Sequence, residues 1–115
     1  KLLLQNADIL LLDEPTKGLD AYLKQELAAI LKKLTSEGIT ILTVTHDLEF
    51  AAAYADRCAL LFDGRITSAE EPHAFFAGNR FYTTTAGLIA EGYIPGAITC
   101  GEVIAECEAA YRRKT

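Results

Sequence analysis

Two adjacent carboxylates, Asp13 and Glu14, directly follow the apolar run Ile9 to Leu12 in the sequence ILLLDEPTKGLD. A short apolar run of this kind predicts a strand buried on both faces, and ligands of open α/β folds bind outside the carboxyl ends of such strands. Neighbouring residues of a strand point in different directions, so one carboxylate can bind Mg²⁺ while the other takes a proton from attacking water. A pair of solvated charges at a strand end is the alternative interpretation.

A second polar residue, His46 in TVTHD, follows the β-branched run Ile39 to Val44, which predicts another strand. If the two strands are parallel neighbours, His46 lies at the same edge of the sheet as Glu14. An imidazole in that position can donate a hydrogen bond to a terminal phosphate and sense its loss. A histidine that is simply satisfied at a strand terminus is the alternative.

The element between these strands is the most clearly marked in the sequence. Apolar residues recur at helical spacing and predict a helix over residues 21–36, with Asp20 placed to cap its start and Gly38 to stop its end. A strand, a helix and a further strand form the unit from which parallel sheets are built. The carboxylates and His46 are thereby predicted to meet at one edge of a parallel sheet.

The remaining elements follow from turn and cap signals. Asp47 is placed to cap a second helix that runs to about Ala55, and Asp63-Gly64 between two apolar runs predicts a β-hairpin. Thr99 and Glu102 form a capping-box pattern. The further expectations are the end of a helix over 2–4, strands over 59–62 and 65–67, and helices over 72–77, 83–91 and 100–112, with Phe75, Phe76, Phe81 and Tyr82 in a packed apolar cluster.

The segment LLLDEPTKGLD, followed about thirty residues later by TVTHD, resembles the second half of an ATP-binding-cassette (ABC) ATPase domain. The resemblance implies an α/β fold: a partial P-loop NTPase core with parallel strands and an antiparallel edge hairpin over 1–67, and a helical extension over 68–115. It also implies roles for single residues. Asp13 corresponds to the Mg²⁺ ligand and Glu14 to the catalytic base. Asp20 belongs to the D-loop that reaches the nucleotide across a dimer, and His46 corresponds to the γ-phosphate switch.

The tail of the sequence narrows the resemblance. FFAGNRFYTTTA and IPGAITCGEVI are similar to the end of the second cassette in fused energy-coupling-factor importer ATPases, which serve uptake of vitamin precursors or cobalt, and Lys17 fits that branch. This implies ATP and Mg²⁺ as cofactors of the intact protein, and a second ABC cassette and membrane transport subunits as partners. The implied location is cytoplasmic, on the inner face of the cell membrane and attached through those subunits.

Two family motifs are missing from the sequence. Nothing matches GxxxxGK[ST], whose backbone N–H groups cradle phosphates, and there is no LSGGQ-type signature. The chain also opens on KLLLQNADI without methionine, which suggests the inside of a longer protein. We therefore expect the chain alone to be inactive, and to self-associate through unpartnered strand edges and apolar surface.

Composition excludes several classes of function. The 115 residues suffice for one domain, and 11 basic against 16 acidic residues give a net charge of −5, which disfavours nucleic acid as a partner. No apolar stretch approaches the roughly 20 residues needed to cross a bilayer. The three cysteines show no ligand-like spacing and suggest reduced thiols. A non-transport ABC-type ATPase, acting in DNA repair or translation, and a structural module without catalysis remain as alternatives.

Overall fold

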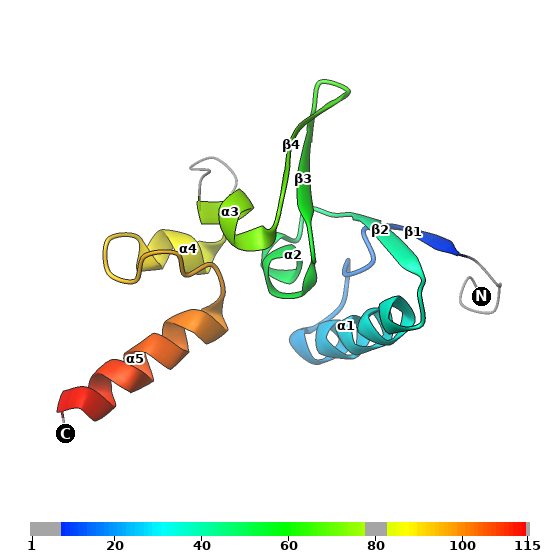
Figure 1. Ribbon diagram of the computed structural model, residues 1–115. Coiled ribbons are helices and arrows are strands. Elements are labelled where there is room, and N and C mark those ends of the chain that lie inside the picture. Colours follow the sequence, from blue (N-terminus) through cyan, green and yellow to red (C-terminus); the bar gives the residue numbers. More distant parts are fainter. Residues whose placement is uncertain (1–7, 78–82, 115) are drawn as a thin grey trace. The chain divides into compact units, whose positions relative to one another are not determined.

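The computed structural model describes residues 8–77 and 83–114 (Figure 1). Two compact units divide the chain, a first unit over Lys1–Asp47 and a second over Leu48–Thr115. The sequence-based division at residue 67 follows the family resemblance rather than compactness and stays a prediction. In chain order the elements are β1 Ile9–Asp13, α1 Ala21–Ser36, β2 Thr40–Val44, α2 Leu48–Tyr54, β3 Cys58–Phe62, β4 Arg65–Glu70, α3 Pro72–Ala77, α4 Thr85–Ala90 and α5 Cys100–Lys114.

The first unit is a strand, helix, strand motif, as the sequence predicts. β1 and β2 pair in parallel, and the register sets Ile9 beside Thr40 and Asp13 beside Val44. Both strands therefore end at the same edge of the sheet, where Asp13 is followed by Glu14 and Val44 by Thr45. The predicted helix end at residues 2–4 lies outside the described residues.

Helix α1 begins and ends at the predicted residues because both ends satisfy their backbone groups locally. Asp20 adopts an extended backbone and its Oδ1 accepts the Leu23 N–H at 2.9 Å, which is an N-cap. At the other end Gly38 has φ +93°, and its N–H bonds Thr35 O at 3.1 Å, while the Ile39 N–H bonds Leu34 O at 3.2 Å. This pair of bonds is a Schellman motif, which turns the chain from α1 into β2.

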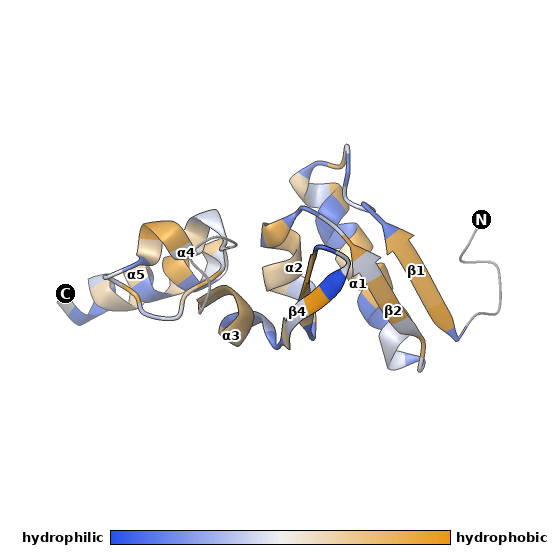
Figure 2. Cartoon of the chain, turned by 90° about the horizontal axis from the view of Figure 1, so that it is seen from above, coloured by the Kyte–Doolittle hydropathy of each residue, from blue (hydrophilic) through white to orange (hydrophobic). Residues whose placement is uncertain are grey.

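The two faces of the β1–β2 sheet differ, and here the prediction that the strand at Ile9 to Leu12 is buried on both faces is wrong. Leu10 has 7 % of its surface exposed, whereas Leu11, on the opposite face, has 66 %. Parallel sheets need cover on both sides, and in the first unit α1 contacts strand β2 of this sheet. Figure 2 shows the apolar character along β1. The exposed apolar face comprises Ile9, Leu11, Leu42 and Val44.

The second unit opens with a helix and a β-hairpin. Strands β3 and β4 pair antiparallel around the predicted Asp63-Gly64 turn, in which both residues have positive φ, 49° and 72°. Two consecutive positive φ values define the turn whose twist matches that of the strands. A register shift between Leu60 and Leu61 inserts an extra residue in β4, which is a β-bulge.

The core of the second unit lies where α2, the hairpin and α3 meet. Phe76 is 2 % exposed and Ile98 is 1 % exposed. The Phe75 and Phe76 rings pack edge to face with centroids 4.9 Å apart, a favoured aromatic geometry. This confirms the predicted apolar cluster for these two residues, whereas Phe81 and Tyr82 lie outside the described residues. The buried members are Ala52, Cys58, Phe75, Phe76 and Ile98.

The helices near the end of the second unit are held by side-chain caps. Thr84 caps α4: its Oγ1 accepts the Gly87 N–H at 3.0 Å and donates to Ile98 O at 2.6 Å. At α5 the predicted capping box is present in both directions. Thr99 Oγ1 accepts the Glu102 N–H at 3.2 Å, and Glu102 Oε2 accepts the Thr99 N–H at 3.1 Å.

No helix within the described parts of the chain is long and apolar enough to cross a membrane. The three cysteines are free thiols: Cys58 is buried in the core of the second unit, while Cys100 and Cys107 are exposed on α5. Burial of Cys58, with a smaller effect of the Glu71 carboxylate, raises the pKa of its thiol. Cys58 is therefore a packing residue and remains protonated near neutral pH.

Candidate functional site

Glu14 leaves the strand with an unusual backbone. Its N–H donates to Val44 O at 2.8 Å, which continues the pairing of β1 with β2 by one residue, but its φ is +47°. A left-handed conformation costs a residue with a side chain roughly 1–2 kcal/mol. Because of this turn Glu14 folds back over the end of β2, whereas Asp13 is still in the strand. The two carboxylates thus face different surroundings, as the sequence predicts.

Both carboxylate oxygens of Glu14 accept hydrogen bonds from the segment that follows β2. The Thr45 hydroxyl donates to Oε2 at 3.2 Å, and the backbone N–H of His46 donates to Oε1 at 3.1 Å. The side chain of Glu14 is 29 % exposed. An ionised carboxylate has about four lone-pair positions, so these two bonds orient the group and leave acceptor positions for a further partner.

The ring of His46 points into solvent beside Glu14. Its side chain is fully exposed, and Nε2 lies 3.6 Å from Glu14 Oε1, which is beyond hydrogen-bonding distance. The backbone of His46 is therefore fixed by Glu14, and the imidazole remains available to another group. The prediction that parallel strands bring His46 to the edge that carries Glu14 holds in the structure, while the role of each residue stays a prediction.

Asp13 is the last residue of β1. It is exposed, and within the described residues no side-chain hydrogen bond or ion pair engages its carboxylate. The same described ranges contain no group of three or more His, Cys, Asp or Glu residues that would hold a metal by themselves. This pattern fits Mg²⁺, which is usually bound by one or two carboxylates together with waters and substrate phosphates.

The loop between Glu14 and α1 is a tight turn. The Lys17 N–H bonds Glu14 O at 3.2 Å, the Leu19 N–H bonds Thr16 O at 3.1 Å, and Gly18 has φ +79°. These bonds carry the chain to Asp20, whose carboxylate caps α1. The structure thus places Asp20 at the start of the helix and brings Glu14 and His46 together elsewhere, at the end of the strands.

Sequence did not point to Thr45 and Lys24 near Glu14, and it indicated Asp47 only as a helix cap. Thr45 contacts the carboxylate directly, and its Oγ1 also accepts the Asp47 N–H at 2.9 Å. Lys24 Nζ, on α1, pairs with Asp47 Oδ2 at 2.6 Å. Thr45 had a signal, because a hydroxyl beside His46 at a strand end is well placed for hydrogen bonding. The Lys24–Asp47 pair had none, because its partners lie 23 positions apart.

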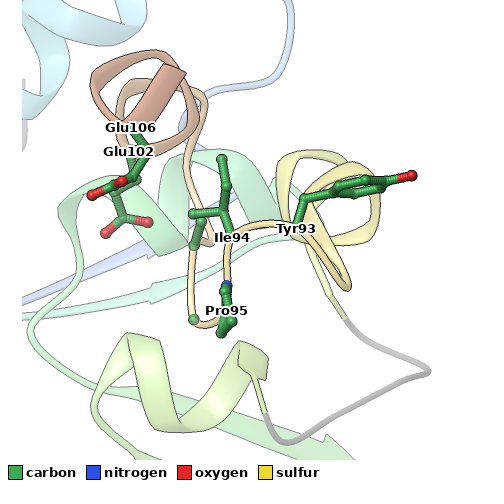
Figure 3. Close-up of a pocket in the computed structure, with 7 residues that line it drawn as sticks. Tyr93, Ile94, Pro95, Glu102 and Glu106 are labelled. Carbon is green, nitrogen blue, oxygen red and sulfur yellow. The ribbon is translucent and has the colours of Figure 1, made fainter. Parts of the chain in front are cut away.

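A separate hollow of about 400 Å³ lies in the second unit, between the loop 93–97 and the first turns of α5 (Figure 3). The Tyr93 ring points away from Glu102 and Glu106 in this view. The Glu102 carboxylate accepts the Ile98 and Thr99 N–H groups and pairs with His73. Glu106 Oε2 lies 3.9 Å from the Arg113 guanidinium. These carboxylates thus have structural partners, and the sheet edge of the first unit is the stronger candidate site.

Parallel strands that end in an Asp-Glu pair and a histidine, joined by a crossover helix, define the class of protein. It is an α/β protein with part of a P-loop NTPase core. The solved structure of CbiO1 from Clostridium perfringens, part of the ABC transporter complex CbiONQ, supports this with a TM-score of 0.56 and 37 % identity over 61 % of this chain and 28 % of that one. The shared fold is that of an ABC ATPase.

Sequence relatives then give the family, although no protein-family model matches the chain. A Bacillus anthracis protein named as an ABC transporter ATP-binding protein is 45 % identical over 92 % of this chain and 19 % of its own length. The hemin import ATP-binding protein HmuV of Streptomyces coelicolor is 40 % identical over 81 % of this chain and 30 % of its own length. The chain's homologues are ABC transporter ATP-binding proteins, and it corresponds to the carboxyl-terminal part of their ATPase domain. It spans about a fifth of the length of the first of these relatives.

Proposed function

We propose that this chain supplies the Walker B carboxylates, D-loop and switch histidine of an ATP-hydrolysing subunit that powers an ABC importer. The observation that carries the proposal is the fixed Glu14 carboxylate between the Thr45 hydroxyl and the His46 N–H, next to the unengaged Asp13 at the carboxyl edge of parallel strands. The names of the relatives, which include hemin import and glutamate transport, support transport over DNA repair or translation.

Each residue then has one task in the hydrolysis of ATP. Glu14 accepts a proton from the water that attacks the terminal phosphorus, as the bond from phosphorus to the ADP oxygen breaks. The exposed His46 ring donates a hydrogen bond to the terminal phosphate, and Asp13 would hold Mg²⁺. The ion, when bound, neutralises charge on the triphosphate. Asp20 reaches the second cassette of a dimer, besides capping α1 as observed.

The finer assignment is to importers of the energy-coupling-factor type. It is supported by the likeness to CbiO1, whose complex is CbiONQ, and by the tail motifs of the second unit. In this proposal the partners are a second ABC cassette and membrane subunits, nucleic acid is not a partner, and the protein works at the inner, cytoplasmic face of the cell membrane through those subunits.

The test of the catalytic assignment is Glu14→Gln in a polypeptide that also supplies the phosphate loop and signature segment. Loss of the base should slow ATP hydrolysis by about 10²- to 10⁴-fold while ATP binding is retained. Glu26→Gln, on the exposed surface of α1, is the matched control and should hydrolyse ATP normally. Near-normal turnover in Glu14→Gln would rule out the assignment.

The 115 residues by themselves are proposed to be inactive, because the sequence contains no phosphate loop. Calorimetry of the chain with MgATP should show no binding in the micromolar range, and micromolar binding would contradict this proposal. The exposed apolar face of the sheet, together with its strand edges, should make the isolated chain self-associate. Sedimentation at increasing concentration tests this, and a monomer throughout would refute it.

A further inference from the structure

A continuous path of hydrogen bonds joins α1 to the carboxylate of Glu14. Lys24 Nζ donates to Asp47 Oδ2 at 2.6 Å, the Asp47 N–H donates to Thr45 Oγ1 at 2.9 Å, and the Thr45 hydroxyl donates to Glu14 Oε2 at 3.2 Å. All of these residues belong to the first unit. The path therefore lies within one compact part of the chain and ends on the proposed base.

The direction of each hydrogen bond follows from the chemistry of the groups. An ionised carboxylate is an acceptor and an ammonium is a donor. The Thr45 oxygen already accepts the Asp47 N–H, so its own proton is free to be donated, and Glu14 Oε2 is the acceptor at hand. Because a hydroxyl has one proton, Thr45 donates its single side-chain hydrogen bond to Glu14. Together with the His46 N–H on Oε1, it fixes the plane of the carboxylate.

The other end of the path lies beside Asp20. The Lys24 N–H bonds Asp20 O at 3.0 Å, in the turn that Asp20 caps. The Lys24 and Asp47 side chains are 35 % and 16 % exposed, so the pair is partly shielded from water. A shielded pair is screened less by salt than an exposed one. The path thus connects the first turn of α1 with the carboxyl edge of the sheet.

We propose that Thr45 and the Lys24–Asp47 pair are positioning residues that orient the Glu14 carboxylate and tie it to the first turn of α1. This inference rests on the proposed function, in which Glu14 is the base. The positioning residues need not touch the substrate. A displacement of the turn that Asp20 caps would reach Glu14 through them.

The first experiment measures the position of Glu14 in the 115-residue chain itself, by NMR at neutral pH. Thr45→Val removes the hydroxyl and keeps the shape of the side chain, and Thr45→Ser keeps the hydroxyl. Thr45→Val removes the bond from the hydroxyl to Glu14 and the bond from the Asp47 N–H to the hydroxyl. Loss of the bond to Glu14 should speed exchange of the His46 N–H by about two- to tenfold and shift the Glu14 carboxyl carbon signal. Thr45→Ser should stay near wild type, and Thr40→Val, at the exposed start of β2, should have no effect.

The far end of the path is tested in the same way. Lys24→Gln should speed His46 N–H exchange and shift the Glu14 carboxyl carbon signal by less than Thr45→Val does. Lys24→Arg should give values near wild type, because a guanidinium also pairs with a carboxylate. Lys32→Gln, on the exposed surface of α1, is the control. Exchange of the central β2 amides reports whether each variant is folded. A folded Thr45→Val with unchanged signals at Glu14 and His46 overturns the inference.

The second experiment uses the ATPase that also contains the phosphate loop. Thr45→Val should lower kcat while the KM for MgATP is retained, and it should have no further effect in a Glu14→Gln background, because the two residues act as one unit. Normal hydrolysis by Glu14→Gln would defeat the proposed function while the NMR contacts stand. A severe Glu14→Gln defect with an unaltered kcat in Thr45→Val would defeat the positioning role.

Discussion

The two units of the chain use polar and apolar residues in opposite ways. In the first unit the polar groups converge on one carboxylate at the sheet edge, and one apolar face of the sheet is open to solvent. In the second unit an apolar cluster around Phe76 is buried, while Leu61, Phe62 and Ile66 of the hairpin are exposed. The buried Thr84 caps α4 and bonds the Ile98 carbonyl. The polar groups of the first unit thus orient a carboxylate, whereas the buried hydroxyl of the second unit holds backbone groups beside an apolar core.

The largest expected effect on the free energy of unfolding is that of truncating Phe76. It should show most clearly that the buried cluster of the second unit contributes more stability than the exposed sheet face of the first. Phe76→Ala removes a side chain that is 2 % exposed and should cost about 3–5 kcal/mol of unfolding free energy. Leu11→Ala, on the exposed face of the first unit, should change it by no more than about 0.5 kcal/mol. Urea unfolding checks both. Equal losses of unfolding free energy in the two variants would contradict the difference between the buried cluster and the exposed face.

A smaller loss is expected at the buried hydroxyl of the second unit. Thr84→Val removes both the cap of α4 and the bond to Ile98 O, and leaves buried backbone groups without a partner. This should cost about 1–3 kcal/mol. Thr84→Ser retains the hydroxyl and should retain most of the stability. Chemical unfolding of the two variants measures the difference, and a loss in Thr84→Ser as large as that in Thr84→Val would show that retaining the hydroxyl does not retain the stability.

The caps and turns were predictable from sequence because they are local. Asp20, the Asp63-Gly64 turn and the Thr99–Glu102 box bond groups at most three or four positions away, so the residues that specify each feature are read together. The parallel pairing of β1 and β2 also followed from pattern, and with it the meeting of Glu14 and His46.

Two features could not be predicted from local sequence: the pairing of side chains far apart in the chain, and the burial of each face of β1. Lys24 pairs with Asp47 across 23 positions, and nothing in the pattern of either segment indicates the other. Burial of β1 was overestimated because an apolar strand reads the same whether one of its faces is covered or both. Sequence thus predicted the residues at the sheet edge, whereas the hydrogen bonds that surround them required the structure.

The end of α1 in the first unit depends on the backbone conformation of Gly38. Gly38→Ala places a side chain at φ +93°, where an added Cβ meets no atom within 4 Å, so the cost is conformational. It should be about 1 kcal/mol, and less for Gly38→Asn, which tolerates this region better. Thermal unfolding monitored on first-unit signals measures it. A stabilised Gly38→Ala would contradict the assigned end of the helix.

The smallest effect concerns an ion pair of the second unit. The bond between Glu102 Oε1 and His73 Nε2, at 2.5 Å, raises the pKa of His73 above its ordinary value of 6.5, with a smaller contribution from Glu71 and against a smaller desolvation effect. Partial burial acts to raise the pKa of Glu102, but the bonds from the Ile98 N–H, His73 and the Thr99 N–H outweigh it and lower that pKa.

The sign of the pH dependence follows from these two directions. His73 contributes its stabilisation fully below its unfolded pKa and loses it as the pH rises through the raised folded pKa, and Glu102 loses its contribution as the pH falls through its lowered pKa. The pair should therefore add less than about 1 kcal/mol, mostly below neutral pH, because it is partly exposed. Unfolding at about pH 5.5 and about pH 8.5 measures it. In His73→Gln the alkaline loss should disappear, and an unchanged profile would refute the assignment.

The positive φ of Glu14 has a consequence for how this position changes under selection. In this left-handed region glycine or asparagine would be less strained than glutamate, and neither has the carboxylic acid that the proposed function assigns to position 14. Variants selected for resistance to proteolysis would drift toward those two residues at position 14, while selection for ATP turnover would return glutamate. With Glu14 as the proposed base, stability and activity favour different residues at this position.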